Sequence, residues 1–242
     1  MKKSSFIGKI KGLFSSAVHD VISVVAPRTC PLCGSVLTDA EEMLCMSCLA
    51  QAEYTGYEDI LFNPMEQRLE RLVGERIPAA SLFIYAHGEV TGRIVSAFKY
   101  AGEKDLAVFA GRLLGQAVSQ SGRFAGFDAL VPIPLHPRRL KRRGYNQARE
   151  LCRGMGVVWN IGVEDLLERQ AYTREQAGLL RTSRLKNTQG VFRLRHGADI
   201  RGRHLVVVDD VFTTGSTVSD AVRVLLRAGA ERVAVLCLCS GG

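Results

Sequence analysis

One stretch near the C-terminal end of the 242-residue chain constrains the fold more than any other. An apolar run, Leu205–Val208, ends abruptly in two adjacent carboxylates, Asp209 and Asp210, and a loop over 209–216 leads directly into an apolar-periodic helix. A strand, a helix and a second strand in this order are typical of a parallel sheet, because parallel strands need a crossover connection. The predicted ranges are 205–208 for the first strand, 217–228 for the helix and 232–238 for the second strand.

The same alternation of strands and helices extends through the preceding residues. We therefore predict an α/β fold with a Rossmann-like, doubly wound parallel sheet flanked by helices. A polar segment over 169–190 has no clear period and is predicted to be a long loop, which in a compact domain is often a lid. The upstream elements that the pattern predicts are strands over 80–85 and 128–133 and helices over 91–100, 105–119 and 146–158.

The loop after the predicted strand over 205–208 carries groups that are suited to binding a phosphate. A helix N-terminus offers unpaired N–H groups and a partial positive charge, and a glycine lets the backbone approach the ligand. Each residue alone is as readily a helix cap or a turn former, but their combination at one junction predicts a phosphomonoester site. The two carboxylates would bind vicinal hydroxyls or approach a divalent cation, so the whole site suits ribose 5-phosphate. The predicted phosphate-binding residues are Thr213, Thr214, Gly215, Ser216 and Thr217, and the predicted catalytic residues are Asp209 and Asp210.

Four of the seven cysteines form the pattern CxxC-x11-CxxC. Two residues between thiols make a tight knuckle that points both sulfurs at one ion, and two knuckles complete a tetrahedron that suits zinc. Because four thiolates leave no position open for a reacting water, the predicted zinc site is structural. An iron–sulfur cluster and a redox pair of thiols stay open as alternatives. The predicted ligands are Cys30, Cys33, Cys45 and Cys48, and the remaining cysteines are predicted to pack in the core.

A second loop, after the predicted strand over 128–133, is rich in arginine. Ligands of doubly wound sheets bind at the carboxyl ends of the strands, and a pyrophosphate leaving group needs cations there to neutralise its developing charge. We predict that Arg139 and Arg143 bind pyrophosphate with the help of His136. The other cations of this loop, predicted to face solvent or a polyanion, are Arg138, Lys141 and Arg142.

The segment LVVVDDVFTTGST resembles the PRPP (5-phosphoribosyl-1-pyrophosphate) signature of type I phosphoribosyltransferases. Together with PIPLHPRRLKRRGYNQA, RQAYTREQAGLLRTSRLKNTQGVF and the cysteine pairs of CPLCG and CMSC, it resembles the ComF (competence protein F) family, which includes GntX-type proteins. This resemblance implies a type I phosphoribosyltransferase fold, PRPP bound with magnesium, and a flexible loop that closes over PRPP.

The loop residues that match the family are Thr173, Gln176, Arg184 and Asn187, for which an ordinary polar loop is the alternative. Lys99, Tyr100 and Lys104 also match the family. A lysine near a helix end is as readily exposed to solvent, however, so no role is predicted for these three residues.

The chain is predicted to comprise three parts. Residues 1–28 form an amphipathic helix, which packs either onto the next module or onto a membrane surface. A zinc-finger module that resembles a double zinc ribbon follows over 29–55, and a mixed stretch over 51–78 holds the domain boundary. The phosphoribosyltransferase-like domain covers 75–242.

The net charge of the chain and its resemblance to the ComF family together limit the functions that we expect. Lys and Arg number 32 against 24 Asp and Glu, and the net charge of +8 favours anionic partners. The resemblance implies a PRPP-binding competence protein that acts in the uptake of single-stranded DNA with a DNA-uptake helicase or translocation complex. No apolar run is long enough to span a membrane, so we expect the protein in the cytoplasm or peripheral to the inner face of the plasma membrane. There are two alternatives. The first is an active phosphoribosyltransferase, which as a glycosyltransferase passes the pentosyl group from PRPP to an unidentified nucleophile. The second is a PRPP-sensing module without turnover.

Overall fold

The computed structural model describes residues 27–170 and 190–241, and these residues fall into two compact units. The first unit ends at Gln51 and the second begins at Ala52. Most of the amphipathic helix predicted over 1–28, and the flexible-loop residues Thr173, Gln176, Arg184 and Asn187, lie outside the described residues. Among the helices of the described ranges, none is both long and apolar enough to cross a membrane.

The described part of the first unit, residues 27–51, contains two tight turns and one short helix. Thr29 and Val36 form an isolated antiparallel bridge, so the backbone between them turns back on itself. Within this turn the amide of Gly34 donates to the carbonyl of Cys30 at 2.8 Å. The helix α2 (Met46–Ala50) begins at Cys45, whose sulfur accepts a hydrogen bond from a backbone amide of the helix. The unit thus presents one cysteine pair on a turn and the other at a helix start.

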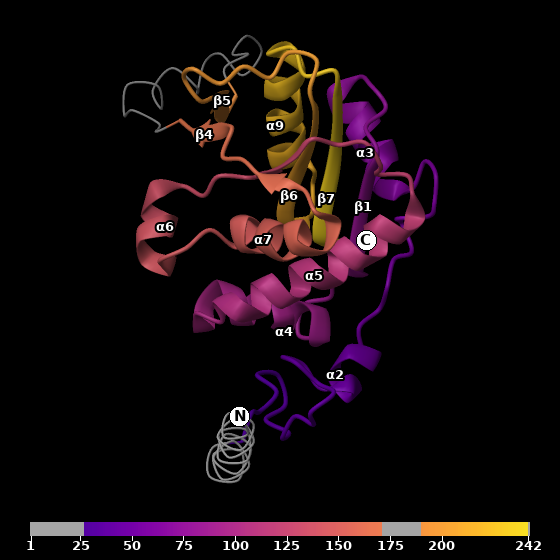
Figure 1. Ribbon diagram of the computed structural model, residues 1–242, viewed down its shortest axis with the longest axis vertical. Coiled ribbons are helices and arrows are strands. Elements are labelled where there is room, and N and C mark those ends of the chain that lie inside the picture. The colour runs from indigo at the N-terminus through magenta and orange to yellow at the C-terminus, as the bar shows by residue number, and fades with distance from the viewer. Residues whose placement is uncertain (1–26, 171–189, 242) are drawn as a thin grey trace, which may run out of the picture. The chain divides into compact units, whose positions relative to one another are not determined.

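A five-stranded parallel sheet organises the second unit, with strand order β1-β7-β6-β2-β3 (Figure 1). The central strands are buried on both faces, which is typical of a parallel sheet covered by helices on both sides. A separate antiparallel pair, β4–β5, flanks the stretch 171–189. The predicted α/β fold with a parallel sheet is confirmed. The strands are β1 (Ala79–Ile84), β2 (Ala129–Pro132), β3 (Gly162–Val163), β4 (Leu167–Arg169), β5 (Phe192–Leu194), β6 (His204–Phe212) and β7 (Arg232–Ser240).

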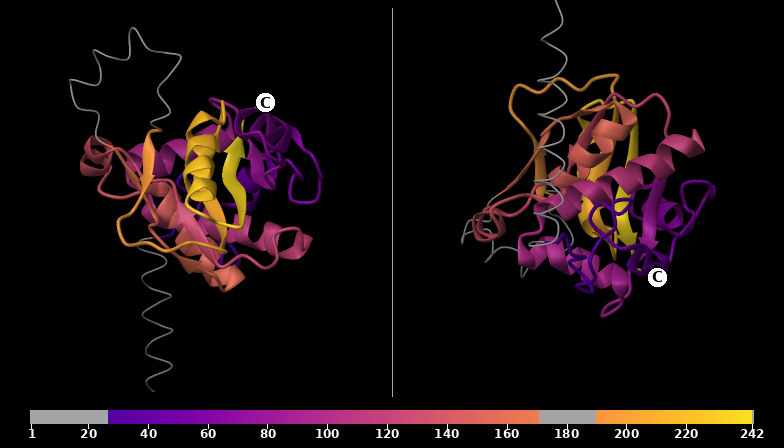
Figure 2. Two further views of the ribbon diagram at one scale, coloured as in Figure 1. Left: turned by 90° about the horizontal axis from the view of Figure 1, so that it is seen from above. Right: turned by 60° about the horizontal axis from the view of Figure 1, so that its bottom comes forward.

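Helices cover the two faces of this sheet (Figures 1 and 2). Two of them, α3 and α9, pack with one face of the strands in a continuous apolar core, and α5 and α7 pack together on the other face. Glycines allow this second pair to touch closely, because a Cβ at Gly111 would lie 2.1 Å from the Leu151 carbonyl oxygen, and one at Gly154 would lie 1.9 Å from that of Val108. The helices are α3 (Pro64–Val73), α4 (Val90–Ser96), the π-helix η1 (Ala97–Ala101), α5 (Lys104–Ser121), α6 (Pro137–Arg143), α7 (Gln147–Trp159) and α9 (Ser216–Arg227).

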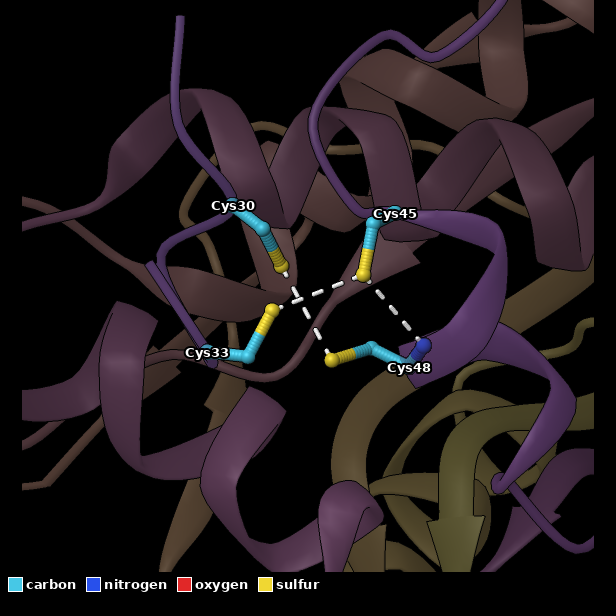
Figure 3. A group of neighbouring side chains, drawn as sticks. All are labelled: Cys30, Cys33, Cys45 and Cys48. Carbon is cyan, nitrogen blue, oxygen red and sulfur yellow. Dashed lines mark hydrogen bonds between the residues drawn. The ribbon is translucent and has the colours of Figure 1, made fainter. Parts of the chain in front are cut away.

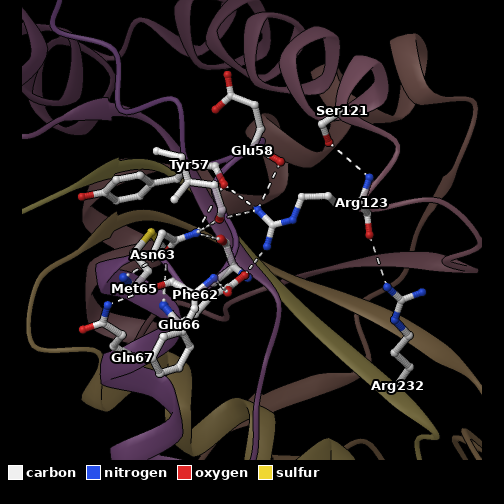
Figure 4. Close-up of polar contacts among 12 residues, drawn as sticks. Tyr57, Glu58, Phe62, Asn63, Met65, Glu66, Gln67, Ser121, Arg123 and Arg232 are labelled. Carbon is white, nitrogen blue, oxygen red and sulfur yellow. Dashed lines mark hydrogen bonds and ion pairs between the residues drawn. The ribbon is translucent and has the colours of Figure 1, made fainter.

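A buried ion pair fastens the segment before α3 to the rest of the second unit (Figure 4). Arg123 pairs with Glu66, and its other nitrogen donates to the carbonyls of Tyr57 and Ile60 at 2.7 and 2.8 Å. Asn63 caps α3 and donates to the same two carbonyls. Residues 52–78 therefore belong to the second unit, and the boundary between the units, after Gln51, lies at the start of the stretch 51–78.

Two local elements differ from the sequence-based expectation. The strand β6 continues through Asp209 to Phe212, because its pairing with β7 persists to the pair Phe212–Ser240. The arginine-rich segment, predicted as a loop, is the helix α6. His136 caps it by accepting from the Arg138 amide at 3.2 Å, and Gly144 ends it with a φ of 80°. The two acids thus lie on a strand, and the cations of α6 lie on a helix.

Candidate functional site

The acid pair lies at the carboxyl end of β6, an interior strand of the sheet. The side chain of Asp209 accepts a hydrogen bond from the backbone amide of Asp210 at 2.8 Å. The Lys99 ammonium, from η1, lies 2.9 Å from the Asp210 carboxylate, and both side chains are largely buried. A lysine from the π-helix η1 therefore partly neutralises the acid pair.

Burial and the neighbouring charge of Asp210 raise the pKa of Asp209 to about 7. The Asp210 amide, Lys99 and Arg169 act in the opposite direction by stabilising the carboxylate. A carboxyl with a pKa near neutrality changes charge when a cation or a hydrogen-bond donor approaches. Such shifts are concentrated at functional sites, where the fold holds like charges together.

The loop that follows β6 forms a small hollow at the start of α9. Gly215 precedes the helix with a φ of 76°, and a Cβ there would lie 2.8 Å from the Phe212 ring. The N-cap residue Gly215 has no side chain to cap this helix, and the Ser216 amide donates to the Thr214 hydroxyl at 3.4 Å, so the N–H groups of Thr217 and Val218 are available to a ligand. Arg68 donates to the Thr214 carbonyl at 3.1 Å and holds the loop from outside. The predicted phosphate residues line the hollow together with Asp209: Thr213, Thr214, Gly215, Ser216 and Thr217.

Lys99, which pairs with Asp210, is one of the residues that line a cavity of about 430 Å³. Its lining residues come from η1 and from the end of α6: Lys99, Tyr100, Gly102, Arg142, Arg143 and Tyr145. A second cavity of about 520 Å³ lies along α6, α7 and β4. Several of its charges are already paired, Lys104 with Glu150 at 3.5 Å and Arg149 with Asp165.

The residues predicted to bind pyrophosphate occupy different positions. Arg143 is half-buried and lines the 430 Å³ cavity, whereas Arg139 is exposed and lines neither cavity. His136 serves as the cap of α6. Arg142, predicted to face solvent, lines the same cavity as Arg143. Lys99 has no predicted role, because the sequence signal for it, a lysine and a tyrosine near a helix end, is equally typical of an exposed surface.

The four predicted metal ligands come together in the first unit (Figure 3). Their sulfur atoms all lie within 4.8 Å of one another, with 3.8 Å between Cys30 and Cys48 and 3.5 Å between Cys33 and Cys45. A zinc ion held by four thiolates at about 2.3 Å separates the sulfurs by about 3.8 Å, so the cluster could bind zinc. Hydrogen bonding with Ser35 lowers the pKa of the Cys33 thiol to about 6, whereas burial raises the pKa of the Cys48 thiol.

Comparisons with known proteins agree with these features. A family model described as the phosphoribosyl transferase domain matches residues 140–242. The DNA utilization protein YhgH of Salmonella typhi is 37% identical over 153 residues, which are 60% of this chain, and the chain spans only 65% of that relative's length. The YhgH of Escherichia coli O157:H7 is 33% identical over 217 residues, 87% of this chain and 83% of that protein. Competence protein F of Haemophilus influenzae is 27% identical over 215 residues, 85% of this chain and 94% of that protein.

Proposed function

Since the chain belongs to the ComF family of phosphoribosyltransferase-like proteins, we propose that it binds PRPP with magnesium at the carboxyl end of β6. One observation carries this proposal. An acid pair near the end of an interior strand is followed by a hydroxyl-rich loop and by a helix start whose N-cap is a glycine, within the residues that match the transferase domain. A phosphorylated sugar with two free hydroxyls has complementary chemistry for these groups in this order.

Each group of the proposed site has a distinct task. The N–H groups at the start of α9 and the hydroxyls of 213–217 hold the 5-phosphate. Asp209 and Asp210 accept hydrogen bonds from the ribose hydroxyls, and magnesium, when bound, neutralises charge on the pyrophosphate. Arg143, with Arg139 and His136, is proposed to bind the pyrophosphate. Of these three residues Arg143 is the best supported, because it lines the 430 Å³ cavity.

If PRPP is turned over, the reaction is a displacement at the anomeric carbon of the ribose. The bond from this carbon to the pyrophosphate oxygen breaks, a bond to the acceptor forms, and the acceptor loses a proton. Positioning and charge neutralisation are sufficient for such a step, so no covalent intermediate is required. The protein is then a glycosyltransferase of the pentosyl class. If PRPP is not turned over, the same site acts as a sensor.

We also propose that the chain serves DNA uptake, because its relatives carry the names competence protein and DNA utilization protein. The net charge of +8 favours single-stranded DNA as an anionic partner. In this role the protein acts on the cytoplasmic side, in solution or at the inner face of the plasma membrane, and a DNA-uptake helicase or translocation complex receives or delivers the strand. The four cysteines hold a structural zinc ion in the first unit, which ends at Gln51.

Thermal unfolding with and without ligand tests the PRPP site. PRPP with magnesium at a hundred times its Kd should stabilise the folded protein by about 2.7 kcal/mol, because it binds only the folded state. Ribose 5-phosphate should stabilise less at the same concentration, since it lacks the pyrophosphate. The double variant Asp209→Ala, Asp210→Ala should lose the response, whereas Asp59→Ala, at an exposed acid far along the chain, should keep it.

Two results separate the alternatives. An unshifted melting curve of the wild type at millimolar PRPP would rule out the proposed site. Release of pyrophosphate in the presence of candidate bases, amines or ribosyl acceptors would identify an active transferase, and binding without release identifies a sensor.

A further inference from the structure

The helix α3 lies beside the loop of the phosphate hollow, although the two are far apart along the chain. The Arg68 Nε donates to the Thr214 carbonyl at 3.1 Å, and 146 positions of the sequence separate these two residues. The family model of the transferase domain matches residues 140–242, which include this loop but not α3. A helix from outside the matched residues therefore contacts the loop that is proposed to hold the 5-phosphate.

The helix α3 is fastened at both of its ends. Asn63 caps its first turn and donates to neighbouring carbonyls (Figure 4). Near the other end, Arg223 of α9 donates to the Leu72 carbonyl at 2.6 Å. One face of α3 is buried in the apolar core that it shares with α9. These contacts fix the backbone of α3, so the Arg68 side chain extends to the loop from a fixed position.

The Arg68 hydrogen bond sets the direction of the peptide bond between Thr214 and Gly215. In the described ranges every peptide bond is trans, and the C=O and N–H of a planar trans peptide point in opposite directions. Because the Thr214 carbonyl points to Arg68, the N–H of Gly215 points away from Arg68. This N–H donates to no atom of the described residues, so it is available to a ligand.

Gly215 is also enclosed on the side of its Cα. A Cβ at this position would lie 2.8 Å from the Phe212 ring and 3.1 Å from the Leu72 Cδ1. The hollow is lined by residues 209 and 211–218, and Arg68 does not belong to this lining. Arg68 therefore acts on the backbone of the loop and not on a ligand in the hollow.

We propose that Arg68 is a positioning residue for the phosphate site. By holding the Thr214 carbonyl outside the hollow, it turns the N–H of Gly215 inward, where this group donates to a phosphate oxygen. The charge of the guanidinium also polarises the peptide group, which strengthens its N–H as a donor. The role rests on the proposed function, because it concerns the same hollow. Loss of Arg68 should thus weaken phosphate binding although every residue that lines the hollow is kept.

Calorimetric titration of the full-length protein with ribose 5-phosphate tests the proposal. Arg68→Met should weaken binding by roughly fivefold or more, because the carbonyl loses its charged donor. Arg68→Lys keeps the charge but loses the planar fork, so its affinity should lie between those of the wild type and Arg68→Met. The matched control is Arg71→Met, which removes the same charge from the same helix. Arg71 donates to a carbonyl of α3 itself, that of Gln67, at 3.2 Å, so this control should stay within about twofold of the wild type.

Nuclear magnetic resonance of the Gly215 amide reports on the direction of the peptide bond, which a general loss of stability would not change selectively. The sequence contains three Thr–Gly pairs, Thr55–Gly56, Thr91–Gly92 and Thr214–Gly215. Isotopic labelling of threonine carbonyl carbons and glycine nitrogens therefore selects three amide signals. Without ligand, the Gly215 signal should differ between Arg68→Met and the wild type. Saturating ribose 5-phosphate should move it further in the wild type than in the variant, and the other two signals should stay in place.

Two results would overturn the proposal. Equal losses of affinity in Arg68→Met and Arg71→Met would mean that only the net charge matters. A Gly215 signal that is the same in Arg68→Met and the wild type would mean that Arg68 does not orient the loop. Failure of the proposed function has a different signature, because the wild-type Gly215 signal would then ignore ribose 5-phosphate. A change of that signal in Arg68→Met would still support the orienting contact.

Discussion

Replacing Asp209 by asparagine tests the electrostatics of the acid pair directly. Asparagine has nearly the same shape, and its side-chain oxygen can still accept the hydrogen bond from the Asp210 amide, which measures 2.8 Å in the wild type. The substitution removes the charge that is held beside Asp210. The contacts around Asp209→Asn should therefore survive, while the cost of ionising this half-buried carboxyl disappears.

The size of this cost follows from the pKa of Asp209, which burial and Asp210 raise from 3.8 to about 7. A difference of about three pKa units corresponds to about 4 kcal/mol, at 1.36 kcal/mol for each unit. Between the unfolded pKa near 4 and the folded pKa near 7, the folded protein binds more protons than the unfolded one, so this group lowers the stability as the pH rises. Above pH 7, Asp209 is ionised in both the folded and the unfolded state, so its destabilising effect no longer changes with pH.

Denaturant unfolding of the two proteins from pH 4 to pH 8 measures the effect. Asp209→Asn and the wild type should be equally stable near pH 4, and the variant should gain up to about 4 kcal/mol over the wild type by pH 8. The control Asp59→Asn, at an exposed position, should show no such gain. A difference between Asp209→Asn and the wild type that does not change with pH, or a wild type that is the more stable protein at pH 8, would refute this account.

Two further predictions concern the remaining polar clusters. Metal analysis of the purified protein should find about one zinc ion per chain. Cys45→Ser should lose the zinc without changing the response to PRPP, because the cysteines belong to the first unit. Zinc-free wild-type protein prepared without chelators would contradict this prediction. Arg123→Ala should destabilise the protein by about 3 kcal/mol in denaturant unfolding, because it leaves Glu66 buried without its cation. The exposed Arg93→Ala should change stability by less than about 0.5 kcal/mol, and an equal effect of both would disprove the role of the pair.

The sequence by itself determined those features that depend on residues close together along the chain. The spacing of the cysteines places each pair within one local element, a turn for Cys30 and Cys33 and a helix start for Cys45 and Cys48, so the metal cluster could be predicted from the pattern alone. The run from Leu205 to Thr217 contains a strand, two acids, a hydroxyl-rich loop and a helix start in succession, and the structure arranges them in that order. Hydrophobic periodicity likewise predicted the parallel sheet, because it reports which face of each element is buried.

The sequence contained signals for the boundaries of α6, but the segment was not predicted as a helix. Pro137 at the first position of α6 and Gly144 after its end are both typical of helix boundaries. The segment between them was predicted as a loop because it follows the strand over 128–133, where the loops of doubly wound sheets bind ligands. The extension of β6 through the acid pair also depends on a neighbour, because β7 supplies the hydrogen bonds that continue the strand.

Only the tertiary structure decided which distant side chains meet. Lys99 and Asp210 lie in different elements far apart in the sequence, and the packing of η1 beside the end of β6 brings their charges to 2.9 Å. The same holds for Arg123 and Glu66, whose pairing places the segment before α3 within the second unit. Periodicity and propensity describe the path of each element and the face that it buries. They contain no information on which residue of another element will lie opposite, because that is fixed by the packing of the whole core.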